Sequence, residues 1–336
     1  MDAAVLLGPR DLRIESRPSP DVHSGEALVE VALAGLCGTD YRIWTGDRPV
    51  AYPRVMGHEC IGRILAVGGE GGGVRPGTRV VIEPNYSCGA CPLCREGNWN
   101  LCAERVAVGI DIDGCFAEVV RVPLRCCWPV PDGVSDEAAV ITEPLAVVVR
   151  AVQRAVPRPG ESAAVVGGGA LGLLALQVLR ARGARVLVVG RTSRRFALAD
   201  ALGAERTHRV SDGPLGAVAR EFSRREGVDL VIETAGTAEA VEHAIDLVRP
   251  GGRVVLTGLP HEPTTLSFFS IVRREITILG SMIYQREFGD ALELLRCGAV
   301  KTDRLVSPRF RLEHLAEALL AHRDATAVKI VVAPRP

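Results

Sequence analysis

Four cysteines lie close together in one segment of the sequence. They follow a Cys-x-x-Cys-x-x-Cys spacing with a fourth thiol seven residues farther on, at Cys88, Cys91, Cys94 and Cys102. Thiolates spaced in this way on turns are typical ligands of a structural zinc ion, which is tetrahedral with bonds of about 2.3 Å to sulfur. Two disulfides or four buried thiols are the alternatives, and the spacing favours zinc. Because four thiolates saturate the ion, catalysis needs another site.

A glycine motif suited to a dinucleotide follows a short apolar run. Gly167, Gly169 and Gly172 form a G-x-G-x-x-G pattern, and Ala170 and Leu171 begin the helical stretch after it. The first glycine allows a tight turn, the second lets the backbone approach a pyrophosphate, and the third permits close packing of helix on strand. The N–H groups at the start of the helix donate to the anion. The alternative is a glycine-rich turn that binds no ligand.

The end of the next expected strand indicates which dinucleotide is bound. An acidic residue at this position would bind the ribose 2′-hydroxyl of NAD, but the chain has Gly190, followed by Arg191-Thr192-Ser193-Arg194-Arg195. Guanidinium groups without a carboxylate suit a 2′-phosphate. The pattern therefore favours NADP(H) over NAD(H), with Arg191 and Arg195 as candidate contacts. The alternative is that these arginines only solvate the start of a helix.

Further residues with metal-binding chemistry are scattered and individually weak. Cys37 lies in Cys-Gly-Thr-Asp, His58 and Glu59 lie in Gly-His-Glu, and Glu143 lies in Thr-Glu-Pro-Leu. A lone cysteine is usually part of the core, and a lone histidine usually makes a structural hydrogen bond. Thr39, two residues after Cys37, could relay a proton or satisfy backbone N–H groups at the start of a helix.

The elements that position these residues fall into two regions. The first 130 residues read as short β-strands separated by Gly and Pro, such as 27–33, 60–67 and 79–82. From about Glu161 strands and helices alternate, which predicts a parallel sheet with helices on both faces. The expected strands are 163–166, 185–189, 228–232, 253–257, 276–279 and 328–332, and the expected helices are 170–182, 194–202, 238–248, 286–296 and 312–322.

Length and composition predict an ordinary two-domain globular protein. The chain has 336 residues, with 40 basic and 40 acidic side chains, so it has no excess charge for nucleic acid or an anionic membrane. The uncharged stretch 162–179 contains four glycines and fits strand, turn and helix better than a membrane span. The amino terminus lacks the pattern of a signal peptide, which predicts a cytoplasmic protein whose ten cysteines are reduced.

Taken together, the motifs resemble those of the zinc-containing medium-chain dehydrogenases, and most of all their polyol branch, that of sorbitol dehydrogenase. The resemblance extends from the Cys-Gly-Thr-Asp motif to the segment 305–310. It implies an α/β protein with a GroES-like, β-rich catalytic domain formed by residues 1–148 and 284–336, including a structural zinc lobe at 84–104. Residues 149–283 would form a Rossmann domain, a doubly wound parallel sheet that binds NADP.

The resemblance also assigns site residues. It implies a catalytic zinc bound by Cys37 and His58, with Glu59 and Glu143 as ligands or as close neighbours through water, and thus two zinc ions per chain. Alcohol dehydrogenases of the family usually have a second cysteine in place of Glu143, so a carboxylate suggests the polyol branch. Thr39 matches the family's proton relay.

Substrate contacts and assembly are expected from the same resemblance. Trp44 and Phe116 match positions near the substrate pocket, although both could equally belong to the core. Arg309 matches an arginine that contacts polyol hydroxyls, although it could form a surface ion pair. The strand at 276–279 pairs across a dimer in the family, which implies a homodimer or homotetramer.

The expected function is zinc-dependent hydride transfer between NADP(H) and a secondary alcohol or ketone of a polyol, sugar or cyclitol. Zinc with an open position lowers the pKa of an alcohol, and the nicotinamide accepts the hydride. One alternative is a zinc-dependent alcohol or aldehyde reductase with a smaller, apolar substrate. Another is a non-catalytic NADP-binding redox sensor, which has no need of the set Cys37, His58 and Glu143.

Overall fold

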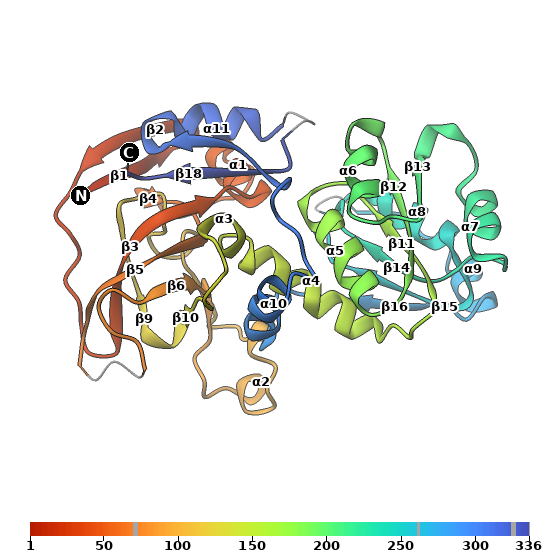
Figure 1. Ribbon diagram of the computed structural model, residues 1–336, viewed down its shortest axis with the longest axis horizontal. Helices are drawn as coiled ribbons and strands as arrows, with labels where there is room; N and C mark the ends of the chain where they lie inside the picture. The colour runs from red at the N-terminus through yellow and green to blue at the C-terminus, as the bar shows by residue number, and fades with distance from the viewer. Residues whose placement is uncertain (70–72, 261–262, 324–326, 336) are drawn as a thin grey trace. The chain divides into compact units, whose positions relative to one another are not determined.

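The computed structural model describes residues 1–336 except 70–72, 261–262, 324–326 and 336. The chain forms two compact units (Figure 1). The first consists of Met1–Glu143, Ala291–Arg296 and Thr302–Pro336, and the second consists of Pro144–Asp290 and Cys297–Lys301. The division falls inside two helices, α4 (Thr142–Ala155) and α10 (Glu287–Arg296), so each of these helices contributes to both units.

The first unit is built mainly from antiparallel strands, which confirms the β-rich prediction. Its large sheet has the order β10-β6-β5-β3-β18-β17, and β9 also pairs with β3. These strands are β3 (Glu26–Gly35), β5 (Glu59–Val67), β6 (Arg79–Ile82), β9 (Val119–Pro123), β10 (Cys127–Pro129), β17 (Val306–Arg311) and β18 (Lys329–Ala333). Smaller sheets contain β1 (Asp2–Gly8), β2 (Asp11–Ser16) and β4 (Arg54–Val55), and β7 (Asn85–Tyr86) with β8 (Val106–Ala107).

Apolar side chains from these sheets form the core of the first unit. Val29 and Val31 of β3 pack in one cluster with Met56 and Phe116, all fully buried or nearly so. Burying one such side chain stabilises a fold by about 1.5–3 kcal/mol. The helices of this unit are short: α1 (Gly38–Thr45), α2 (Pro92–Arg95), α3 (Asp136–Ala139) and α11 (Leu315–Ala321). The packed sheet therefore holds in place the residues that directly precede or follow its strands.

The second unit is a six-stranded parallel sheet with helices, as the alternating pattern predicts. Its order is β13-β12-β11-β14-β15-β16. The strands are β11 (Ser162–Val166), β12 (Arg185–Gly190), β13 (Arg206–Arg209), β14 (Val228–Glu233), β15 (Val248–Leu256) and β16 (Thr277–Gly280). The helices are α5 (Ala170–Ala181), α6 (Phe196–Ala201), α7 (Leu215–Ser223), α8 (Ala238–Leu247) and α9 (Phe268–Arg273). This arrangement confirms the predicted Rossmann-like fold.

The structure corrects several element boundaries in the second unit. The helix predicted for 194–202 starts with a 3₁₀ turn at Ser193–Arg195, and only then continues as α6. The sequence did not reveal β13, because its residues are polar and it lies at the edge of the sheet. Strand β15 starts five residues earlier than predicted, since Pro250 and the glycines after it are typical of a turn but here belong to an irregularly paired strand.

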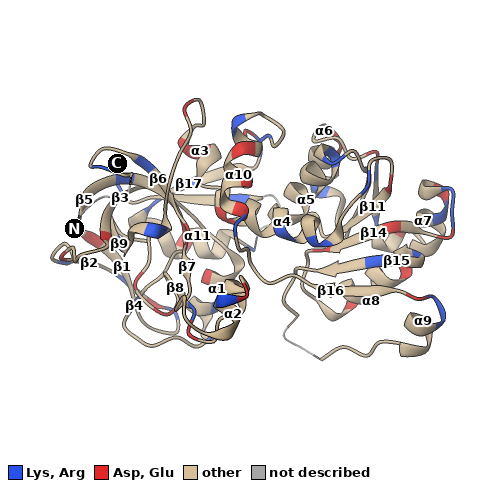
Figure 2. Ribbon diagram, turned by 90° about the horizontal axis from the view of Figure 1, so that it is seen from below, with Lys and Arg blue, Asp and Glu red and all other residues tan. Residues whose placement is uncertain are grey.

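The uncharged stretch 162–179 forms β11, a glycine turn and most of α5, as predicted. Over the residues that the structure describes, no helix is both long enough and apolar enough to cross a membrane. Basic and acidic positions are interspersed over both units (Figure 2), in keeping with the balance of 40 basic and 40 acidic side chains.

Candidate metal centres and dinucleotide-binding loop

Two strands of the large sheet bring Cys37, His58 and Glu59 together. Cys37 lies between β3 and α1, His58 immediately precedes β5, and Glu59 is its first residue. The strands pair antiparallel, with Gly35 opposite Glu59. One ligand atom from each of the three side chains lies within 4.8 Å of the other two. A thiol, an imidazole and a carboxylate at this spacing form a donor set that suits zinc.

Asp40 connects the two segments that carry these ligands. Its Oδ2 accepts the backbone N–H of Cys37 at 2.9 Å, and its Oδ1 lies 3.3 Å from Nδ1 of His58. Because Nδ1 faces a fully buried carboxylate, Nε2 is the ring nitrogen left to bind a metal, as is common for zinc-bound histidines. The sequence pattern alone gave no role to Asp40. In the structure it orients the imidazole.

Burial and charge act on this pair in opposite directions. Burial alone would lower the pKa of His58, but the charge of Asp40 and contact with Cys37 raise this pKa well above its ordinary value. Burial would raise the pKa of Asp40, but His58, the N–H of Cys37 and the more distant Lys329 lower it. Asp40 is therefore a carboxylate that favours positive charge beside it.

Lys329, at the start of β18, brings a cation to the same cluster. Burial alone would lower its pKa, but the charges of Glu59, Cys37 and Glu143 raise it. Its Nζ forms an ion pair with Oε2 of Glu59 and donates to the carbonyl oxygen of Leu36 at 3.2 Å. Glu143, in the first turn of α4, is 9% exposed. It is not one of the three side chains whose ligand atoms lie within 4.8 Å of one another.

The structure also locates the other candidate residues of the first unit. Thr39 lies in the first turn of α1 and is partly exposed. Trp44, near the end of α1, and the fully buried Phe116 belong to the hydrophobic core. Arg309 on β17 is exposed and lies 3.9 Å from Glu137. Contact of these side chains with a substrate stays a prediction.

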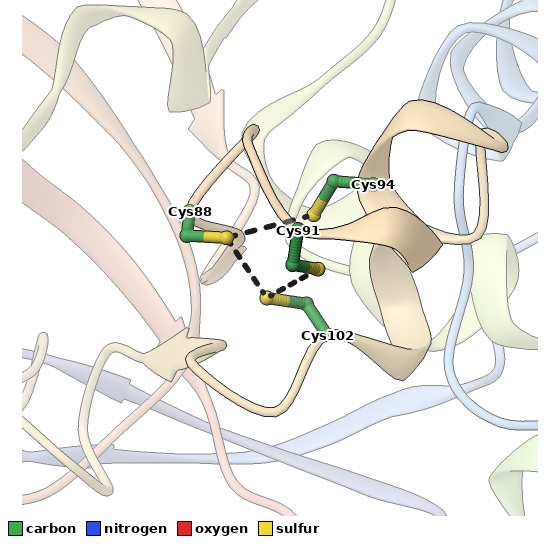
Figure 3. Close-up of side chains that lie close together, drawn as sticks. All are labelled: Cys88, Cys91, Cys94 and Cys102. Carbon is green, nitrogen blue, oxygen red and sulfur yellow. Dashed lines mark hydrogen bonds between the residues drawn. The ribbon is translucent and has the colours of Figure 1, made fainter.

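The four cysteines of the predicted zinc lobe converge, as Figure 3 shows. The sulfur of Cys102 lies 3.6 Å from that of Cys88 and 3.9 Å from that of Cys91, and the sulfurs of Cys88 and Cys94 are 3.9 Å apart. Disulfide-bonded sulfurs would be about 2.0 Å apart. Four thiolates at about 2.3 Å from a tetrahedral ion are separated by about 3.8 Å. The geometry thus fits a structural zinc site.

Local structure acts on these thiols in different ways. Cys91 precedes α2 at its N-terminal end, and Cys102 follows a 3₁₀ turn at Trp99–Leu101. A hydrogen bond with Ser87 is the largest influence on Cys94 and lowers its pKa to about 7. A backbone hydrogen bond with Cys94 lowers the pKa of Cys91, but burial and the neighbouring thiols outweigh it and raise this pKa to about 11. The Cys94 thiolate is therefore accessible near neutral pH before a metal binds, whereas that of Cys91 is not.

The glycine motif forms the turn between β11 and α5 that the sequence predicts. Gly167 has φ of +113°, and a Cβ atom there would lie 2.6 Å from Oγ1 of Thr234. A Cβ atom on Gly172 would overlap the carbonyl oxygen of Gly167. Gly169 is the residue before the first turn of α5, which contains Ala170 and Leu171. Both Gly167 and Gly172 are thus required by backbone geometry, and the N–H groups of the helix start are directed at the turn.

The basic segment after β12 reaches this turn. Gly190 ends the strand, Arg191 follows it and is exposed, and Nη1 of Arg195 donates to the carbonyl oxygen of Gly168 at 3.3 Å. The sequence did not select Thr234, whose hydroxyl donates to the carbonyl oxygen of Val166 at 2.9 Å. The sequence held one signal for this role. Thr234 directly follows β14, which pairs parallel with β11, the strand that leads into the glycine turn.

Comparisons with known proteins agree with this geometry. A family model described as an alcohol dehydrogenase GroES-like domain matches residues 23–132, and one described as a zinc-binding dehydrogenase matches residues 170–296. Sorbitol dehydrogenase of Bacillus subtilis (strain 168) is 33% identical over 328 residues, which cover 95% of this chain and 92% of that protein. The chain belongs to the zinc-containing medium-chain dehydrogenase family.

Solved structures match this dehydrogenase over nearly its whole length. A protein described as a zinc-binding dehydrogenase from Sinorhizobium meliloti 1021, bound to NADP, has a TM-score of 0.95 and 34% identity, with 99% of each chain covered. An alcohol dehydrogenase from Escherichia coli CFT073, complexed with NADH, has a TM-score of 0.93 and 31% identity, again with 99% of each chain covered. The predicted family and fold are confirmed, and the dehydrogenase is a zinc- and NAD(P)-dependent enzyme that acts on alcohols.

Proposed function

We propose that this dehydrogenase transfers a hydride between NADP(H) and a secondary alcohol, or the matching ketone, of a polyol, sugar or cyclitol. The convergence of Cys37, His58 and Glu59 within 4.8 Å carries the proposal. The buried carboxylate of Glu143 stands where simple alcohol dehydrogenases have a cysteine, which favours a substrate with several hydroxyls. Similarity to a sorbitol dehydrogenase supports the same substrate class.

Different residues of the site would bind the metal and transfer the proton. Cys37 and His58 would hold the zinc, with Glu59 and Glu143 as ligands or as neighbours through water. Bound zinc supplies a Lewis acid that lowers the pKa of an alcohol, and bound nicotinamide supplies the hydride acceptor. Thr39, at the partly exposed start of α1, can accept the alcohol proton through its hydroxyl and pass it outward.

We assign the cofactor preference to the segment after β12. Gly190 contributes no carboxylate to repel a 2′-phosphate, while Arg191 is exposed beside it. Arg195 lies against the glycine turn, where a dinucleotide pyrophosphate binds in this fold. A similar structure bound to NADP supports the preference for NADP(H), although another is complexed with NADH.

We further infer a homodimer or homotetramer that works in the cytoplasm. Strand β16 is an edge strand of the second sheet, and a polar backbone edge of this kind is open to pairing. Nearby in the sequence, α9 exposes Phe268 and Phe269 over more than 70% of their surface. All ten cysteines are free thiols, which suits a reducing compartment.

Replacing a predicted catalytic-zinc ligand tests the proposed function. Cys37→Ser or His58→Ala should remove one of two zinc ions per chain and abolish turnover, because either change removes a donor from the three-residue cluster. Zinc content by mass spectrometry, oxidation of a polyol panel with NADP⁺, and NADPH binding by fluorescence would be measured together. Cofactor binding should persist. Turnover that survives loss of this zinc would refute the mechanism.

A further inference from the structure

Lysine is rare in this chain, and one of its few lysines is buried. Among 40 basic side chains only Lys301 and Lys329 are lysines. Lys301 is exposed, whereas Lys329 is only 5% exposed. A buried ammonium loses its hydration and needs compensating partners. This chain uses arginine for nearly all its basic residues, yet it has a lysine, with its compact ammonium, at the most buried basic position. That position lies next to the metal cluster.

The contacts of Lys329 join both segments that supply metal ligands. Its Nζ pairs with Oε2 of Glu59, the residue after His58. The same Nζ donates to the carbonyl oxygen of Leu36 at 3.2 Å, the residue before Cys37. One side chain from β18 therefore fixes the start of β5 relative to the end of β3.

The sheet leaves no room for a side chain at Gly35, beside this ion pair. Gly35 of β3 is opposite Glu59 on one side and Val331 of β18 on the other. A Cβ atom on Gly35 would overlap Oε2 of Glu59 and lie 3.0 Å from Cε of Lys329. The two charged side chains therefore meet over a glycine. A guanidinium is planar and wider than an ammonium, so Lys329→Arg changes the shape of the group that meets Glu59.

The charges around Lys329 explain why a cation is needed. With zinc bound, a Cys37 thiolate and the carboxylates of Asp40, Glu59 and Glu143 would carry four negative charges, against two positive charges on the ion. The ammonium of Lys329 offsets one of the two remaining negative charges, which matters because uncompensated charge is costly in a buried site. Because Nζ of Lys329 holds Oε2 of Glu59, only the other carboxylate oxygen of Glu59 is left to bind a metal. Glu59 can then bind through one oxygen at most and cannot chelate the ion through both.

We propose that Lys329 is a positioning residue of the metal centre that holds Glu59 in an ion pair and so keeps one coordination position open for substrate. This inference rests on the proposed function, because it assumes that zinc binds at Cys37 and His58. It adds a residue that acts through Glu59 and that the ligand motifs do not include.

The visible spectrum of cobalt, introduced at this site while zinc stays at the four-cysteine site, tests the inference. Cobalt with four ligands absorbs more strongly than cobalt with five or six, so the bands report coordination geometry. Lys329→Met removes the charge with little change in side-chain length and should weaken and shift the bands, because the released carboxylate adds a ligand. Lys329→Arg should not restore them. Adding Glu59→Gln to Lys329→Met should restore them, which a merely structural role for Lys329 would not produce.

Lys301→Met is the matched control, since it removes the other, exposed lysine, and its spectrum should equal that of the unaltered protein. An unchanged spectrum in Lys329→Met would overturn the inference while leaving the proposed function intact. Absence of cobalt from the Cys37 site of the unaltered protein would instead overturn the proposed function. If Lys329→Met does not fold, Lys329→Gln is measured in the same way, and failure of both to fold with metal bound would show a structural role and overturn the inference.

Discussion

At the scale of single residues, the metal and cofactor sites depend on side chains that orient or fix neighbouring groups. Asp40 orients His58 by facing its Nδ1, and Thr234 ties β14 to the backbone before the glycine turn. Arg195 is held against the same turn. A hydrogen bond involving a charged group contributes about 1.5–3 kcal/mol, so one such side chain can set a cofactor preference.

Replacing Arg191 tests the proposed preference for NADP(H). Arg191→Ala should lower the ratio of kcat/KM for NADP⁺ to that for NAD⁺ by roughly ten- to a hundredfold, because it removes a charged contact worth about 1.5–3 kcal/mol. Steady-state kinetics with each cofactor at fixed substrate measure the ratio. Arg182→Ala, at an exposed arginine beyond the other end of α5, is the control. A ratio that stays the same in Arg191→Ala would contradict the assignment.

At the scale of elements, neighbouring strands of the parallel sheet are joined at their amino ends by one buried carboxylate. Asp229 of β14 accepts the N–H and the hydroxyl of Ser162 at 2.9 and 2.8 Å, and Nε of Arg249 of β15 at 2.8 Å. Burial raises the pKa of Asp229, but Arg249 and Ser162 outweigh it, so the pKa is lowered. The carboxylate thus links β11, β14 and β15 at the edge opposite the glycine turn.

The lowered pKa of Asp229 predicts how stability depends on pH. Its contribution to the free energy of unfolding is complete above the unfolded-state value, about 3.9, and is lost as pH falls toward the folded-state value. Asp229→Asn should cost about 1–3 kcal/mol at pH 7, because it disrupts a buried charged network, and less below about pH 4. Urea unfolding followed by far-UV circular dichroism at both pH values measures the difference.

Two controls sharpen this measurement. Asp246→Asn alters an exposed aspartate of the same unit and should change the free energy of unfolding little at either pH. All three tryptophans, Trp44, Trp99 and Trp128, belong to the first unit, so their fluorescence should report a transition that Asp229→Asn leaves in place. An equal cost of Asp229→Asn at pH 7 and at pH 3.5 would show that the ionised network does not stabilise the sheet.

At the scale of the whole molecule, the proposed oligomer would cover surfaces of the second unit that now face solvent. Phe268, Phe269 and Val272 of α9 are each more than 70% exposed. Several large apolar side chains exposed on one short helix are typical of an interaction surface. The edge strand β16 lies next to α9 in the sequence and can pair with a second copy of itself.

Removing the two phenylalanines tests the assembly. The unaltered protein should elute as a dimer or tetramer, and Phe268→Ser with Phe269→Ser should shift it toward the monomer at the same concentration, since about 1.5–3 kcal/mol of burial is lost per side chain. Size-exclusion chromatography with light scattering measures the mass. Leu320→Ser, at an exposed leucine of α11 in the first unit, should leave it unchanged. A monomeric unaltered protein would disprove the inferred assembly.

Local sequence determined much of this protein, because several of its features depend only on neighbours along the chain. The four cysteines lie within one short segment of the chain, so their spacing alone predicts a site that the sulfur distances fit. The glycine turn is equally local, since the conformation of Gly167 and the packing of Gly172 follow from a strand that leads directly into a helix. Alternating strands and helices likewise predicted the parallel sheet.

The motifs and the family resemblance name the residues of the catalytic cluster, but only the tertiary structure shows that they meet, because its members come from distant segments. Pairing of β3 with β5 and β18 brings Cys37, Glu59 and Lys329 together, and register between strands is a property of the whole sheet. In the sequence Lys329 is an ordinary member of an apolar strand, almost 300 residues from Cys37. Its role can be inferred only from the sheet, in which β18 lies beside β3. There the ammonium is buried and needs a negatively charged partner, and Glu59 is close enough to provide it.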